Sequence, residues 1–205
     1  MEKYPVSLSI DYSGESDRIQ VLFRLILAVP ILVILSLLTS SSHEGLEAAG
    51  GGLRVYTIGF VFLPALLMIL FRQKYPKWWF DWNLALTRFS IRVGAYLLLL
   101  RDEYPSTDSE QSVHIEIPYP DVKMELSRWM PLVKWLLVIP HVIVLSFLMI
   151  GVTFCTIAAW FIILVTGNYP RVIFEFVIGT LRWSIRVFAY AFLLTTDEYP
   201  PFSLK

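Results

Sequence analysis

The chain has 205 residues, 56% of them hydrophobic, and a mean hydropathy of +0.62. Soluble domains are about 45–50% apolar, so this excess indicates a membrane protein. The formal net charge is zero, which argues against a nucleic-acid binder, because such proteins carry clustered positive charge. Cys155 is the one cysteine, so the chain can form no internal disulfide.

Two short segments alternate apolar and polar residues. Residues 6–12 read VSLSIDY, and residues 113–119 read VHIEIPY. A period of two is typical of a strand with one buried face. The two strands either pair outside the bilayer or remain extended segments that never meet, and the sequence leaves both open.

The first apolar segment covers residues 19–38, and at about 20 residues it is long enough to span a bilayer. We expect Arg24, near its start, to extend its charged end to the membrane interface. A polar, glycine-rich insert at residues 39–52 should form a solvated loop. Residues 53–71 form a second apolar segment. Together these segments predict a hairpin of membrane helices.

A longer apolar segment covers residues 131–165. As one straight helix it would be about 52 Å long, whereas the hydrocarbon core of a bilayer is about 30 Å thick. We therefore predict a turn at residues 149–152, around Gly151. The two resulting helices would either just span a thin bilayer or form a hairpin that penetrates it without crossing.

Two further segments, residues 87–96 (TRFSIRVGAY) and 181–190 (LRWSIRVFAY), share a charge pattern. In each, two arginines are four residues apart, and an acidic residue precedes the first arginine by seven. Positions with this spacing lie on one narrow stripe of a helix. The sequence therefore predicts two mostly apolar helices with charged stripes. The stripes consist of Asp81, Arg88 and Arg92, and of Glu175, Arg182 and Arg186.

These matching segments belong to an internal repeat. LAVPILVILSLL at residues 27–38 resembles LVIPHVIVLSFL at residues 137–148, and RDEYP at residues 101–105 resembles TDEYP at residues 196–200. Matches in a fixed order indicate a duplicated unit. We predict a first membrane repeat at residues 1–105, a polar linker at residues 106–112 and a second membrane repeat at residues 113–205.

The arginine-bearing helices either span the membrane or lie in its interface. If both spanned, each repeat would cross three times and the repeats would be inverted, as in many transporters. If both are interfacial, each repeat crosses twice, and 16 of the 17 lysines and arginines fall on the side of the N-terminus, with only Arg54 opposite. An arginine at mid-bilayer costs about 2.5–3.5 kcal/mol. The positive-inside rule therefore favours interfacial helices and cytoplasmic termini.

Several motifs of the second repeat point to a known family. They are IPHVIVL, a tryptophan six residues before TGNYPR, LRWSIRV-x-AY and DEYPPFSL. On these motifs the chain resembles, over residues 118–204, the bacterial membrane family called domain of unknown function 4389. The first repeat looks like a diverged second copy in tandem, with Ile31 in place of His141 and QKYPK in place of TGNYPR. The resemblance implies an integral membrane protein and carries no activity, substrate or catalytic residue.

The repeated arginines are the candidate site. A guanidinium group can donate two parallel hydrogen bonds to a phosphate, so contact with lipid headgroups is one interpretation. The other is structural, with the arginines satisfied by the nearby acids, by carbonyls or by headgroups. The sequence leaves both open. The residues concerned are Arg88, Arg92, Arg182 and Arg186.

Small residues in the same two helices would allow another helix to approach closely. We predict that they serve helix–helix packing. These residues are Ala85, Ala95, Gly179 and Ala189.

His141 follows Pro140 inside an apolar segment. An ionisable group there is a candidate ligand or proton carrier, and the alternative is a neutral histidine that hydrogen-bonds near a helix bend. His43 and His114 lie in polar segments, and no two metal ligands are spaced for one helix face. We expect no metal, no cofactor and no enzymatic activity, since the sequence also lacks a nucleophile motif.

Taken together, the sequence predicts an all-α integral membrane protein. Each repeat should contain a helical hairpin and an amphipathic arginine-bearing helix, with short cytoplasmic β-strands. The expected location is the bacterial inner membrane. The expected function is a non-catalytic subunit or scaffold that docks another membrane protein, or a second copy of itself, among membrane lipids. The alternative is a lipid or small-molecule transporter with an arginine-lined site between the repeats.

Overall fold

A computed structural model of the chain describes residues 4–39, 63–107 and 109–205. The polar insert and much of the second apolar segment lie outside these ranges, so the first predicted hairpin is not described. Within them the chain is mostly helical and contains one two-stranded sheet.

The expected strands form, and they pair. β1 (Ser7–Ile10) and β2 (Val113–Glu116) are antiparallel, with Leu8 opposite Ile115. The apolar side chains of both strands are buried on one face. The other face is polar and exposed, as the alternation predicts. Its exposed residues are Ser9, His114 and Glu116.

In the described chain, three helical segments lie between β1 and β2. α1 (Arg18–Thr39) is apolar and continues through Pro30. A short apolar helix, Leu63–Arg72, ends in a π-helical turn, η2 (Met68–Arg72). α3 (Lys77–Leu97) starts directly after Pro76, whose fixed φ suits the beginning of a helix.

The turn predicted at residues 149–152 is wrong. α4 (Met130–Thr166) is a single helix of 37 residues, about 55 Å long. A Cβ placed on Gly151 would lie 3.4 Å from the ring of Phe176 on α5, an ordinary van der Waals distance, so this position packs against the next helix and does not interrupt α4. The prediction failed because it assumed that the helix runs straight across a bilayer.

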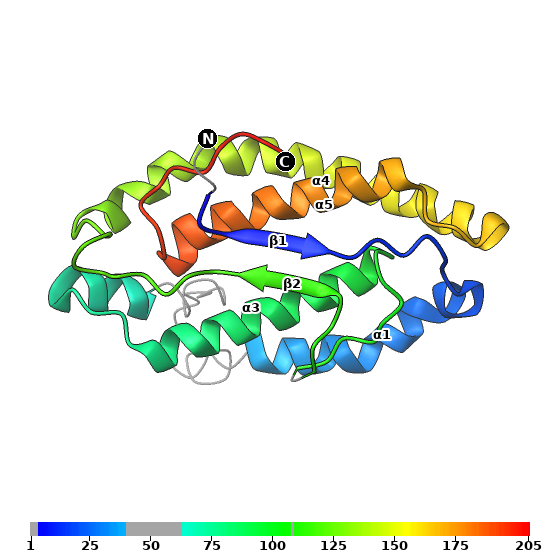
Figure 1. Cartoon of the computed structure of the whole chain (residues 1–205), viewed down its shortest axis with the longest axis horizontal. Coiled ribbons are helices and arrows are strands. Elements are labelled where there is room, and N and C mark those ends of the chain that lie inside the picture. The colour runs from blue at the N-terminus through cyan, green and yellow to red at the C-terminus, as the bar shows by residue number, and fades with distance from the viewer. Residues whose placement is uncertain (1–3, 40–62, 108) are drawn as a thin grey trace, which may run out of the picture.

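α5 (Arg171–Phe188) returns alongside α4 and continues into a π-helical turn, η3 (Ala189–Leu193) (Figure 1). α4 ends at Gly167, which has a φ of 78°. Glycine is favoured at such a C-cap because other residues pay a steric cost there.

The elements form a layered structure in which the strands and long helices run along the long axis (Figure 1). β1 packs on α5 and β2 packs on α3, and these helices pack in turn on α4 and α1. α3 and α5 therefore lie between the sheet and the apolar helices. β1, from the N-terminal half, therefore packs on α5 of the C-terminal half. β2, from the C-terminal half, packs on α3 of the N-terminal half.

α1 and α4 bury only one edge. In α1 the buried edge carries Val21, Arg24, Ala28 and Ile31. Only 22% of the most apolar window of α1, and 17% of that of α4, is buried, whereas the core helix of a soluble protein would be mostly covered. Both helices are long and apolar enough to cross a membrane, which suggests membrane association.

Two tight turns recur at matching places in the halves. Gln73 (φ 45°) and Gly167 (φ 78°) each lie two residues before the tyrosine of a Tyr-Pro pair. Leu99 (φ 65°) and Leu194 (φ 56°) each lie three residues before the Asp of a DEYP sequence. A left-handed conformation costs a residue with a Cβ about 1–2 kcal/mol, so the glycine form of the first turn is the less strained one.

We predict that Gln73→Gly raises the stability of the chain by about 0.5–1 kcal/mol, because it removes this strain while the gain in unfolded-chain entropy offsets part of the benefit. The matched variant, Gly167→Ala, should be destabilising. Thermal unfolding in detergent measures both. A Gln73→Gly variant that melts below the natural chain would contradict the prediction.

Candidate functional site

Two of the repeated arginines hold the strands. Arg182 Nε donates to the carbonyl of Leu8 at 2.9 Å, and Arg88 Nη2 donates to the carbonyl of Ile115 at 3.3 Å. Leu8 and Ile115 are directly opposite each other in the sheet. Each arginine comes from the helix on which that strand packs.

These arginines occupy the open edges of the sheet. Asp11 N–H donates to the Ser112 carbonyl, which places the hydrogen-bonded pairs of the ladder on alternate residues. By that alternation, Leu8 and Ile115 form a pair whose carbonyls point away from the partner strand. A two-stranded sheet has two such edges, and each receives one guanidinium group.

The other two arginines bind the segments that follow their helices. Arg92 donates to the Ser106 carbonyl at 2.8 Å, and Arg186 donates to the carbonyls of Ser203, at 3.4 Å, and Lys205. Burial lowers the pKa of Arg186 from its ordinary value, although a guanidinium group remains charged at neutral pH.

The acidic residues of the stripes do not pair with these arginines in the contacts observed. Glu175 instead binds Arg171, with Nε 2.9 Å from Oε1. The geometry therefore favours the structural interpretation, in which backbone carbonyls satisfy the arginines. Contact with lipid headgroups stays a prediction.

Arg24 does not extend to the interface as expected. Its side chain is 2% exposed and forms an ion pair with Asp102. It also donates to the Tyr96 carbonyl at 2.9 Å, and its guanidinium carbon lies 4.6 Å from the centre of the Tyr96 ring. The other oxygen of Asp102 accepts the Asp17 N–H at 2.8 Å. This buried pair joins α1 to the end of α3.

Lys134 makes the matching set of contacts in the other half. Its ammonium group is fully buried, 2.8 Å from Asp197 Oδ1 and 4.9 Å from the centre of the Tyr190 ring. It also donates to the Thr196 carbonyl at 2.7 Å. Asp197 Oδ2 accepts the Ser127 N–H at 2.6 Å. The pair joins α4 to the segment after η3.

Sequence reasoning missed both buried ion pairs. The signal was a cation near the start of each long apolar segment and an aspartate in each DEYP sequence. Taken separately, the cation predicts a side chain that extends to the membrane interface, and the aspartate predicts a solvated helix end. Arg24 and Asp102 are 78 residues apart in the sequence, so only the folded chain shows that they meet.

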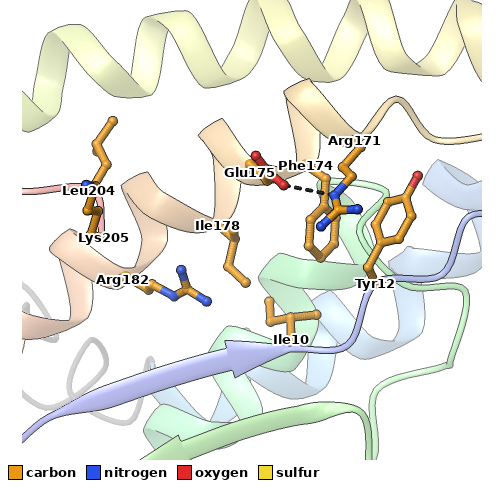
Figure 2. A pocket seen from close by; sticks show the side chains of 9 residues that line it. All are labelled: Ile10, Tyr12, Arg171, Phe174, Glu175, Ile178, Arg182, Leu204 and Lys205. Carbon is orange, nitrogen blue, oxygen red and sulfur yellow. Dashed lines mark hydrogen bonds and ion pairs between the residues drawn. The ribbon is translucent and has the colours of Figure 1, made fainter.

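A groove of about 480 Å³ lies where β1 meets α5. Figure 2 shows the guanidinium groups of Arg171 and Arg182 on the two sides of Ile178. Arg182 uses its Nε for Leu8, so its two terminal nitrogens face the groove together with Lys205 (Figure 2). This arrangement can accept an anionic group such as a phosphate, because two guanidinium groups outnumber the single carboxylate of Glu175.

His141 lies in an aromatic cluster. It is fully buried, and its Nδ1 accepts a hydrogen bond from Trp183 Nε1 at 3.0 Å. Its ring stacks on Phe202 at 4.0 Å and contacts Tyr199 at 4.8 Å. Because Nδ1 accepts, a neutral ring carries its proton on Nε2. The histidine thus fastens the C-terminal segment to α4 and α5.

The small residues differ in their surroundings. Ala95 and Ala189 are fully buried, whereas Ala85 is exposed on α3. A Cβ on Gly179 would lie 2.7 Å from the carbonyl oxygen of Leu204. Gly179 therefore permits close approach by the C-terminal segment.

Across residues 4–39, 63–107 and 109–205, no group of three or more His, Cys, Asp or Glu side chains is placed to hold a metal ion. His43 lies outside the described residues.

We predict that Asp197→Asn destabilises the chain by about 3 kcal/mol, because it leaves the buried Lys134 ammonium without its counter-charge. Adding Lys134→Met should recover part of the loss, since the buried charge is then absent. Unfolding in detergent measures the stability of the Asp197→Asn variant and of the double variant. The neighbouring Glu198→Gln, at an exposed position, is the control and should change stability by less than about 0.5 kcal/mol. Equal effects of the two single carboxylate variants would contradict the assignment.

Comparison with known proteins gives one family. A family model described as "Domain of unknown function (DUF4389)" matches residues 128–203. This range holds α4 and α5 and corresponds to a single copy of the predicted repeat. No curated protein and no solved structure matches the chain. The match supports the resemblance to this family for the C-terminal half.

Proposed function

We propose that the chain is a non-catalytic membrane scaffold that docks another membrane protein. The apolar outer faces of α1 and α4 would hold it in the membrane. Charged side chains of the helices contribute to the fold: Arg24 and Lys134 pair with carboxylates, and two of the candidate arginines, Arg88 and Arg182, bind the strands. This use of its charges favours a scaffold.

An exposed aromatic stripe on α3 carries the proposal. Trp78 is 67% exposed and Trp82 is 38% exposed, and both rings pack on Trp79. Ala85 continues the same face at helical spacing. Tryptophan is enriched among the residues that contribute most to protein interfaces, and a small residue beside it allows a partner helix to come close.

We also propose that the chain is a tandem repeat whose two halves exchange strands. The observations behind this proposal are the matched pairs: Arg88 and Arg182 on the outward carbonyls of two opposite strand residues, two buried cations on two DEYP aspartates, and two left-handed turns in each half. The sheet register pairs Leu8 with Ile115, and these residues are equivalent in the sequence alignment of the halves. The predicted boundaries, residues 1–105 and 113–205, would then be boundaries in sequence and not in space.

The transporter alternative has one observation in its favour, the groove between β1 and α5. Of the four repeated arginines, Arg182 lines this groove. Arg88, Arg92 and Arg186 are engaged with carbonyls of the strands and following segments. A transport site would need the arginines of both halves in one cavity, so we favour the scaffold.

The proposed location is the cytoplasmic side of a bacterial inner membrane. The positive-inside rule supports it. Tyr4 Oη donates to the Glu198 carbonyl, so the two ends of the described chain lie together and would share one side.

We predict that a photo-crosslinking amino acid at Ala85 forms a discrete adduct with one membrane protein in native membranes. Trp78→Ser with Trp82→Ser should reduce the adduct yield at least tenfold, because truncating an aromatic residue at the centre of an interface costs about 2 kcal/mol or more. The adduct is measured by immunoblotting and identified by mass spectrometry.

The matched control places the same crosslinker at Trp135, on the apolar outer face of α4, where we expect adducts with lipid. Adducts at Ala85 that contain lipid only, or that persist unchanged in the double tryptophan variant, would contradict the docking proposal.

A further inference from the structure

We infer that the chain lies flat in the membrane, with α1 and α4 both immersed in one leaflet and the sheet facing water on that same side. No helix of the described chain crosses the bilayer in this arrangement. The inference concerns membrane placement and does not depend on the scaffold function.

The outer surface of α4 is suited to hydrocarbon along its whole length. From Leu132 to Val165 its exposed residues include no charged side chain, because Lys134 is fully buried. The exposed hydroxyls of Ser146 and Thr153 each donate to the carbonyl four residues earlier in the same helix. These hydroxyls are therefore satisfied within the helix, as contact with lipid requires.

α1 continues the same surface. From Ile19 to Leu38 its exposed residues are apolar apart from Ser36, whose hydroxyl donates to the Val33 carbonyl. α1 and α4 contact each other, and Trp160 Nε1 on α4 donates to the Val21 carbonyl on α1 at 3.2 Å. The apolar surfaces of the two helices therefore meet where α1 begins and α4 nears its end.

The polar face of the sheet runs along the same axis as these helices (Figure 1). Val152, Ala159 and Ile163 of α4 belong to one apolar core with the buried side chains of both strands. Figure 1 shows the sheet beside the middle of α4 along this axis. The exposed polar side chains of the sheet are on the side away from that core.

A spanning orientation would conflict with this geometry. If α4 crossed the bilayer along its axis, the sheet beside it would cross as well, and Glu116 and His114 would lie at hydrocarbon depth. Ionisable groups exposed to lipid there are strongly unfavourable. At about 55 Å, α4 would also exceed a hydrocarbon core of about 30 Å.

A flat orientation removes both conflicts. The length of α4 is then unrestricted by membrane thickness, which explains how 37 residues form one unbroken helix. The polar face of the sheet and the apolar face of the helices lie on opposite sides of the molecule, as in an amphipathic interfacial element. The partner that fits the apolar face is therefore the acyl region of one leaflet.

The test uses the full chain with Cys155→Ser and single cysteines at exposed positions flanking α4: Lys123→Cys before it and Asn168→Cys after it. An impermeant maleimide is applied to sealed vesicles of the source membrane, from outside and then after permeabilisation. We expect both positions to react from the same side. Reaction from opposite sides would show that α4 crosses and would overturn the inference.

A nitroxide on Thr153→Cys, at the middle of α4, separates the remaining arrangements, with Ile157→Cys as a second exposed position should the first variant fold poorly. We expect relaxation by oxygen and little relaxation by a water-soluble nickel complex. Strong relaxation by nickel would place mid-α4 in water, as a crossing hairpin requires, and weak relaxation by both would mean that protein covers this face. Either result overturns the inference. A nitroxide on Glu116→Cys, on the sheet, is the control and should respond to nickel.

Discussion

The structure depends on how a two-stranded sheet is protected at its open edges. Each edge strand presents carbonyls with no strand partner, and each receives a guanidinium group from the helix beneath it, from Arg182 at Leu8 and from Arg88 at Ile115. Because the helices come from opposite halves of the chain, these hydrogen bonds also tie the halves together. The arginines must therefore face the sheet, and this fixes which sides of α3 and α5 remain for the apolar helices.

The buried ion pairs hold the apolar helices to the other side of the layer formed by α3 and α5. Arg24 and Lys134 reach from the apolar helices to aspartates that follow α3 and η3. Each pair is shielded by a tyrosine ring and by further hydrogen bonds, as a buried charge requires. With the charges used inward, the outer faces of α4 and of α1 after Arg18 are left without any. A polar face and an apolar face thus arise on opposite sides of one molecule.

Local pattern sufficed for the strands and for the arginine helices, because alternation and helical spacing are read over a few residues. It did not suffice for α4, since the turn expected at Gly151 rested on an assumed orientation in the bilayer, and Gly151 instead lies within the helix beside Phe176. The buried ion pairs could not be predicted from the sequence either, because Lys134 and Asp197 meet only in the tertiary fold. The arginines were recognised as a repeated feature, but the sequence could not show that their acceptors are carbonyls of strands far away in the chain.

Neutron reflectometry on a single supported bilayer that contains the perdeuterated full-length chain tests the central claim most directly, because it resolves where protein lies along the membrane normal. The account predicts protein density in the headgroup and acyl regions of one leaflet and in the water beside it. Protein density through the acyl regions of both leaflets would contradict it.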